Sequence, residues 1–464
     1  MRLRLGTLLL CGSTLLLPAQ EANLDDLLGG FDDTPALDVA ELDIPKAETP
    51  ETSWLSAYGD LSFATAYNYA HEAPEDGQTD YRGLSRARTE ADLTLDAAFQ
   101  NGWRGKLEME LFYDAVYRIN GRDDYTDEVL DEYETEAEIN EAYLQGSPLN
   151  NFDLKIGRQI VVWGKSDNIR ITDVINPLDN REPGMIDIED LRLPVVMTKA
   201  DYYLGAWNLS AMLIHESRVQ KEVQVGSDFL PIHLFPLPGG VFPDAVEPDS
   251  KIGDPQLALA ANGRFSGWDL SLYAARVLDG RWYLHPETSG GFTRRYDRMN
   301  MVGLAANVAL GNWLLKTEGA HLSDLRYSSV DGRKKRLDLL VGTEYTGMTD
   351  TTLSLEIANR HLYDYEAIME NAPNFAYEDE QQLALRGSYS FNHDKGMLSL
   401  LLSRFFADGD TLGGLTRFWM DYELSDGLNG SIGLVDYTGG AKAVLDALKD
   451  NDRVFADITY SFGL

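Results

Sequence analysis

The densest group of ionisable side chains in this sequence begins at Arg158 and continues through residues 165–194. Its members of interest are Arg158, Lys165, Asp167, Arg170, Asp173, Asp179 and Arg181. Acidic and basic groups interleaved in this way can line a water-filled passage and select solutes by charge. A connection of this length can also fold into a lumen and narrow it. We therefore predict that these residues form a pore constriction, with an outward loop braced by ion pairs as the alternative.

The rest of the chain offers little chemistry of other kinds. Its single cysteine is Cys11, and its seven histidines fall singly, outside any recognisable motif with a Ser or Asp partner. The sequence therefore predicts no catalytic residue, no metal site and no cofactor. The excess of 75 acidic over 40 basic residues argues against nucleic acid as a partner.

In the segments that must position the charged group, apolar and polar side chains alternate with a period of two. From Trp103 to Arg118 apolar side chains alternate with charged ones, so that one face suits lipid and the other water. About eighteen such segments occur, with sixteen as the alternative, and they begin near Trp54, Leu84, Trp103, Thr135, Phe152, Val195, Trp207, Pro255, Trp268, Met299, Trp313, Lys335, Thr351, Glu380, Met397, Leu412, Asn429 and Asp452. This pattern predicts an all-β protein, a transmembrane antiparallel β-barrel over residues 54–464, rather than a soluble sandwich.

Short and long connections alternate between these segments. Four tight turns are each followed at once by a tryptophan, namely Trp103, Trp207, Trp268 and Trp313. Indole rings favour a membrane interface because the ring is apolar while its N–H stays hydrated, so we predict a girdle there. The tight turns then lie in the periplasm, and an even strand number places both termini on the same side.

The turn between the second and third strands, and the need to keep charge out of lipid, predict how these strands pair. A short turn at Asn101-Gly102 sets Asp96 opposite Lys106 and Arg88 opposite Asp114, with all four side chains in the lumen. The predicted lumen is hydrated and holds cross-strand pairs of both signs.

A break in the pattern occurs in the fourth and fifth strands. Glu141 and Arg158 fall in the lipid-facing phase, yet a turn centred near Leu149 sets them opposite one another, where they can neutralise each other as a cross-strand pair. Two interpretations stay open: a bulge turns both inward to anchor the 165–194 segment, or the pair only stabilises the wall.

The two ends of the chain have patterns of their own. Met1-Arg2-Leu3-Arg4 and the apolar run Leu5–Leu17 predict a signal peptide over 1–19, with cleavage after Ala22 as the alternative. Residues 20–53 are acidic, lack strand periodicity and are predicted to form a periplasmic extension. The last strand alternates up to Leu464 and resembles the assembly signal of outer-membrane barrels, which makes the barrel-assembly machinery an expected partner.

A family resemblance is carried by the residues around the fifth strand. These are Gly157-Arg158-Gln159, Trp163-Gly164-Lys165-Ser166-Asp167, Ile169-Arg170, Asp173-Val174 and Asn176-Pro177-Leu178-Asp179. They resemble the signature of a Gram-negative outer-membrane family known only as a domain of unknown function, which is distantly similar to alginate-export porins. Its members are often encoded beside large exporters and periplasmic lipid-carrier-like proteins, which implies traffic in lipidic or poorly soluble molecules. The family usually has an acidic residue where Lys165 stands, so no role is carried over to that position.

These observations predict a porin-like channel in the outer membrane, with a bore set by residues 165–194. Outer-membrane lipids and lipopolysaccharide are its expected surroundings, and a periplasmic carrier or exporter is a further expected partner. The alternative is an adaptor or sheath for an export or electron-transfer partner, which would have no open pore.

Overall fold

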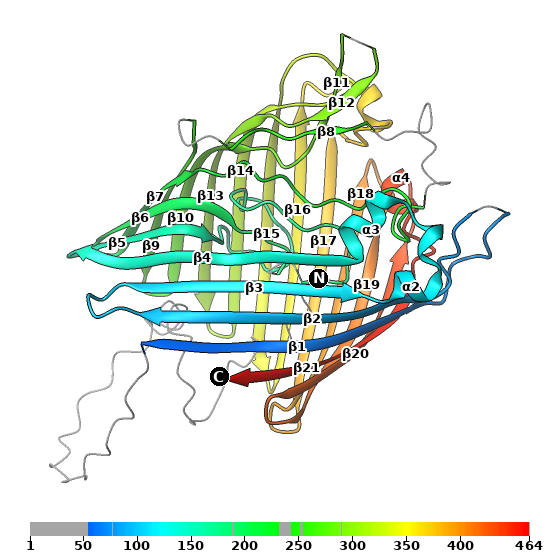
Figure 1. Ribbon diagram of the computed structural model, residues 1–464. Coiled ribbons are helices and arrows are strands. Elements are labelled where there is room, and N and C mark those ends of the chain that lie inside the picture. Colours follow the sequence, from blue (N-terminus) through cyan, green and yellow to red (C-terminus); the bar gives the residue numbers. More distant parts are fainter. Residues whose placement is uncertain are drawn as a thin grey trace.

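The computed structural model describes residues 54–76, 78–187, 190–231, 243–250, 254–288 and 290–463. The predicted signal peptide and acidic extension, residues 1–19 and 20–53, lie outside the described residues. Eighteen antiparallel strands form one closed barrel (Figure 1), because the first strand, β1, pairs with both β2 and the last strand, β21. The fold class and the strand number predicted from the sequence are confirmed.

The strands of the barrel begin within two residues of the predicted starts. They are β1 (Leu55–Asn68), β2 (Gly83–Ala98), β3 (Arg104–Asp114), β4 (Thr135–Leu149), β5 (Phe152–Gln159), β6 (Val195–Leu204), β7 (Trp207–Ile214), β9 (Gln256–Phe265), β10 (Trp268–Leu278), β13 (Arg298–Leu310), β14 (Trp313–Leu325), β15 (Lys334–Met348), β16 (Thr351–Tyr363), β17 (Asp379–Phe391), β18 (Gly396–Ala407), β19 (Asp410–Ser425), β20 (Leu428–Thr438) and β21 (Arg453–Gly463).

Smaller elements lie in the long connections. A separate three-stranded sheet contains β8 (Ala245–Val246), β11 (Tyr283–Pro286) and β12 (Phe292–Arg295). The short helices are α2 (Val116–Asn120), η1 (Arg122–Asp124), α3 (Asp127–Tyr133), η3 (Ala367–Glu370) and α4 (Ala443–Asp446). None of the helices among the described residues is long and apolar enough to cross a membrane.

The alternation in sequence becomes an alternation of inner and outer faces. In β15, Leu339 and Val341 are 51% and 63% exposed, whereas Asp338 and Leu340, which alternate with them, are 2% and 1% exposed. Large apolar side chains left uncovered on the outside, with charged ones inside, are what contact with hydrocarbon requires.

The four predicted tight turns are present, and a glycine with positive φ lies in each: Gly102, Gly205, Gly267 and Gly311. Aromatic rings gather beside them, since Trp268 stacks on Phe265 with ring centroids 4.2 Å apart and Trp207 meets the same ring edge-on. The start of β1 lies at this end too, because Trp54 O accepts a hydrogen bond from Ala98 N.

One predicted register is confirmed. Asp96 lies opposite Lys106, and Arg88 lies opposite Asp114. The Lys106 ammonium group does not pair with Asp96 in the structure. It lies 2.9 Å from the carboxylate of Glu141, on the next strand.

The predicted position of Glu141 opposite Arg158 is wrong. A bulge at Asn140 and an irregularity near the β4–β5 turn shift the register, so that Ala142 lies opposite Arg158. The bulge reverses the phase of β4 and brings Glu141 to Lys106 on the lumen side.

The third strand is shorter than predicted, because it ends at Asp114 rather than Arg118. The Asp114 carboxylate accepts hydrogen bonds from Ala87 N and Val116 N, at 2.9 and 3.1 Å, and so starts the helical turn of α2. Helix α3 follows, with the Thr126 hydroxyl accepting from Val129 N as its N-cap.

Val341 offers a test of the lipid-facing surface. Val341→Arg is expected to lower the free energy of unfolding by about 2–4 kcal/mol, the cost of a cation facing hydrocarbon near mid-membrane. Val341→Leu, the control, is expected to change it little. Urea unfolding of both variants in lipid vesicles checks this, and equal stabilities would contradict the assignment of the outer face.

Candidate functional site

The chain leaves the wall after β5 and returns at β6, and the intervening residues 160–194 are named the inner segment. Its first part is apolar and buried: Val161, Trp163, Ile169, Ile171 and Ile175 belong to one cluster with wall residues of β6 to β17. Trp163 stacks on Tyr273 of β10 with ring centroids 4.6 Å apart. One side of the lumen is therefore filled by apolar packing, which the predicted hydrated lumen did not include.

A single wall carboxylate, Glu318 of β14, holds the backbone of this part. Its Oε1 accepts hydrogen bonds from the N–H groups of Lys165 and Ser166, at 2.5 and 2.8 Å. Its Oε2 accepts from the N–H and the hydroxyl of Thr172, at 3.1 and 2.7 Å. Gly164 has φ +93°, and a Cβ there would lie 2.7 Å from Glu318 Oε1, so the close approach requires glycine.

A second carboxylate, Glu356 of β16, does the same for the adjacent residues. Its two oxygens accept from the N–H groups of Asp167 and Asn168, both at 3.0 Å, and from the Ser166 hydroxyl at 2.7 Å. The Asp167 carboxylate in turn pairs with Lys316 of β14. Glu318 and Glu356 are only 2% and 1% exposed, and charge-assisted hydrogen bonds to N–H groups are what keeps such buried carboxylates stable.

The middle of the inner segment is tied to itself. Asp173 Oδ2 accepts from Nε of Arg170 at 3.1 Å and from Nε of Arg192 at 2.7 Å. The Asn176 side chain accepts from Val161 N at 2.9 Å and donates to Leu193 O at 2.8 Å, which joins the start of the segment to its end.

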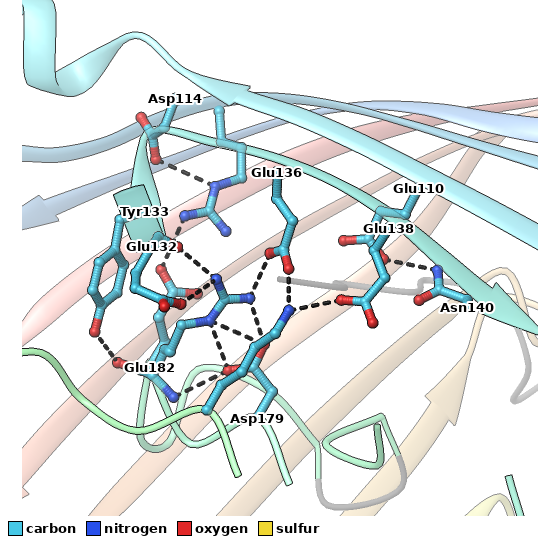
Figure 2. A network of polar contacts seen from close by, with 12 residues as sticks. Glu110, Asp114, Glu132, Tyr133, Glu136, Glu138, Asn140, Asp179 and Glu182 are labelled. Atoms are coloured by element: carbon cyan, nitrogen blue, oxygen red, sulfur yellow. Dashed lines mark hydrogen bonds and ion pairs between the residues drawn. The ribbon is translucent and has the colours of Figure 1, made fainter. Parts of the chain in front are cut away.

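The far part of the inner segment is charged and reaches the opposite walls. Arg181 binds the carboxylates of Asp179 at 2.6 Å and of Glu136, on β4, at 2.7 Å. Glu182 lies 2.5 Å from Arg86 of β2. Figure 2 shows Glu136 and Glu138 pointing from β4 toward the part of the chain that carries Asp179 and Glu182.

Two arginines on β17 and β19 complete the anchoring. Arg386 and Arg417 lie 3.1 and 3.0 Å from the two oxygens of Asp187. The inner segment therefore spans the lumen, from an apolar wall bearing two acceptor carboxylates to a wall bearing arginines.

A second inner segment, residues 215–231, follows β7. Its backbone pairs with the first segment, since Lys221 N donates to Leu178 O at 2.9 Å and Asn180 N donates to Lys221 O at 2.8 Å. Further along, Asp228 lies 3.1 Å from Arg453 of β21. No pattern in the sequence distinguishes this segment from an exposed loop.

The structure brings most of the predicted constriction residues into these contacts. Lys165 contributes mainly its backbone, since its ammonium group lies 3.9 Å from Asp269. Arg158, at the end of β5, lies 3.1 Å from Glu138 and 3.3 Å from Glu216. The two carboxylates that hold the segment, Glu318 and Glu356, were recognisable from sequence only as water-facing residues of the wall.

A cavity of about 210 Å³ lies between the inner segment and the wall. Its charged lining is Arg170, Asp173, Glu216, Arg218, Asp279, Arg281, Arg336 and Asp338, and its apolar lining includes Ile171, Val195, Ile214, Leu278, Met299 and Leu322. A solute there would meet both signs of charge and an apolar patch.

Sequence comparison identifies the family to which the chain belongs. Residues 38–462 match the model of a family described as "Protein of unknown function (DUF1302)". The chain belongs to this family. No curated protein sequence matches the chain.

Solved structures share the fold of this DUF1302 protein at low sequence identity. OccK1 (OpdK) of Pseudomonas aeruginosa is 11% identical with a TM-score of 0.52, over 88% of this chain and 99% of that one. OccAB2 of Acinetobacter baumannii is 12% identical with a TM-score of 0.53, over 88% and 98% of the two chains. A likeness at this level shows a common barrel architecture.

The ionisation of Glu182 follows from its neighbours. Burial alone would raise the pKa of this carboxyl, but Arg86 and Arg88 outweigh burial and hold its pKa well below the usual range. Burial likewise opposes the ionisation of Asp179, and Arg181 lowers the pKa of that carboxyl nonetheless.

Glu318→Gln tests the backbone anchor. Glutamine presents one acceptor oxygen and an NH₂ group that cannot accept from Thr172 N, so the substitution is expected to destabilise the inner segment by about 1–3 kcal/mol. Proteolysis within residues 160–194 should accelerate. The control is Glu344→Gln, because Glu344 contacts the Lys316 ammonium group at 3.2 Å rather than the segment backbone. Equal cleavage of both variants would contradict the anchor.

The depressed pKa of Glu182 predicts that the stability of the folded protein depends on pH. Because its folded pKa is depressed, its contribution to stability is complete above the unfolded pKa of about 4.3 and is lost as the pH falls from there toward the folded pKa. Glu182→Gln should therefore be less stable than the parent at neutral pH, and the difference should narrow below about pH 4. Melting temperatures of both proteins across pH check this, and a constant difference would be the contrary result.

Proposed function

We propose that the protein is a porin-like channel that passes solutes across the outer membrane, with a bore set by the inner segment. The observation that carries this proposal is the anchoring of that segment on opposite walls, by Glu318 and Glu356 on one side and by the arginines that hold Asp187 on the other. A segment fixed at both sides of a lumen narrows it at a defined place.

The structural neighbours support this class. One of them is described as the outer membrane protein OpdK of Pseudomonas aeruginosa, and another structure shows OpdK with vanillate. For this chain we propose a small solute that carries both charge and apolar surface. Such a solute matches the mixed lining of the 210 Å³ cavity, in which Arg281 and Arg336 stand near Met299 and Leu322.

The location and surroundings are part of the same proposal. Both termini would lie in the periplasm, beside the tight turns, and the tryptophans after those turns would form the inner girdle. Lipopolysaccharide would surround the opposite end, the barrel-assembly machinery would insert the chain, and a periplasmic carrier or exporter would meet the turns. The sequence resemblance to alginate-export porins stays a prediction.

Ion conductance in planar bilayers tests the channel. We expect measurable conductance from the purified protein and a larger one from the double variant Glu318→Gln/Glu356→Gln, because loosening the inner segment widens the bore. Glu344→Gln serves as the matched control and should conduct like the parent. No conductance from a folded parent would overturn the proposal and would favour an adaptor or sheath.

A further inference from the structure

The wall has a seam between β4 and β5. The ladder between these strands runs only from Ala142 and Arg158 to Leu149 and Phe152. Residues 135–139 of β4 still pair with β3 on the other side. Among the described residues, no strand pairs with β4 on its β5 side beyond Ala142, because the chain leaves the wall after Gln159.

This seam lies at the depth of the membrane. Glu136 and Glu138 are opposite Phe112 and Glu110 of β3, a strand of 11 residues, which is about the length that crosses the hydrocarbon layer. The seam occupies the half of β4 that is away from the tight turns. An unpaired strand edge at this depth is costly, so another interaction must close it.

Apolar side chains border the seam on the outside. Ile139 of β4 is 48% exposed, Val162 beyond the end of β5 is 61% exposed, and Val196 of β6 is 38% exposed. Their exposure at membrane depth means that this rim meets lipid tails.

Charged side chains close the seam from the inside, in place of backbone hydrogen bonds. Glu138 pairs with Arg158 at 3.1 Å, with Lys221 at 2.7 Å and with Arg218. Glu136 pairs with Arg181 at 2.7 Å and with Lys221. Arg158 comes from the end of β5, and the other three cations come from the two inner segments, so the closure depends largely on parts of the chain that are not strands of the wall.

The cavity of about 210 Å³ adjoins this closure from the lumen. Arg218, which pairs with Glu138, is part of its lining, together with Glu216, the second partner of Arg158. Val195, the residue before the exposed Val196, lines it too. The ion pairs of Glu138 with Arg218 and of Arg158 with Glu216 therefore join the seam directly to side chains that line the cavity.

We propose that the β4–β5 seam is a lateral passage between the cavity and the membrane for amphiphiles with an anionic head group and an apolar tail. The head group replaces the Glu138 carboxylate as the partner of Arg158, Arg218 and Lys221, so the cations stay neutralised while the seam opens. The tail moves outward past Ile139 and Val162 into lipid. This inference rests on the proposed channel and names a substrate class and an exit for it.

The test bridges the seam chemically. Because Cys11 lies in the predicted signal peptide, the pair Glu138→Cys/Arg158→Cys can be joined selectively by a short bis-maleimide. The protein is placed in phosphatidylcholine nanodiscs that contain lysophosphatidylglycerol with a photoreactive head group, and adducts are mapped by mass spectrometry. Adducts on cavity residues are expected without the bridge and lost with it, while adducts on the outer wall stay unchanged.

Controls separate the passage from other effects. Bridging Ala358→Cys/Gln382→Cys, a pair in the continuous β16–β17 ladder, should leave the cavity adducts unchanged. Glu138→Gln should raise their yield about threefold by weakening the closure, whereas Asp201→Asn, a wall carboxylate on the continuous β6–β7 ladder, should not. A photoreactive phosphatidylcholine should label the cavity more weakly.

The outcomes are distinct. Cavity adducts that persist in the bridged protein, or that are absent from the unbridged one, would overturn the lateral passage. Conductance of the bridged protein is measured in parallel and should equal that of the unbridged protein. Loss of the adducts with unchanged conductance supports the passage, whereas a parent without conductance refutes the channel whatever the adducts show.

Discussion

Backbone N–H and C=O groups within a membrane must find partners inside the protein, and this constraint shapes both the wall and its lumen. Backbone ladders between neighbouring strands meet it around the barrel, as the closing β1–β21 pair does from Tyr58 to Asn68. Where the chain leaves the wall after β5, side chains accept the backbone hydrogen bonds instead. Glu318 and Glu356 accept the N–H groups of the inner segment, and Glu141 accepts from Ile160 N at 3.3 Å.

The inner segment has an order along its sequence that matches the wall around it. The apolar side chains of residues 161–175 pack on the apolar wall of β6 to β17, and Glu182 and Asp187 further along contact the arginines of β2, β17 and β19. A segment placed the other way round would bury unpaired charge against methionines such as Met197 and Met301, at a cost of several kcal/mol. Packing and charge therefore select one placement across the lumen.

The same departure from the wall leaves β4 without a strand on its β5 side before Ala142, and this gap is the basis of the proposed lateral passage. The cations that close the seam, Arg181 and Lys221, belong to the segments that fill the lumen. A solute that displaces these segments also loosens the seam.

Much of this architecture is already determined by local sequence. The alternation with period two fixed the class, the eighteen strands and the turns before Trp207 and Trp268, because each strand must sort its own side chains between lipid and water. The register of β2 and β3 followed from the same need. The placement of Glu141 did not, since it depends on a bulge at Asn140 in the pairing of β4 with β3. Nor did the sequence show which N–H groups Glu318 accepts, or that residues 215–231 enter the lumen. The Glu318 contacts join residues 146 to 153 positions apart, and residues 215–231 pair with another part of the chain that is itself inside the lumen, so only packing in the closed barrel decides both.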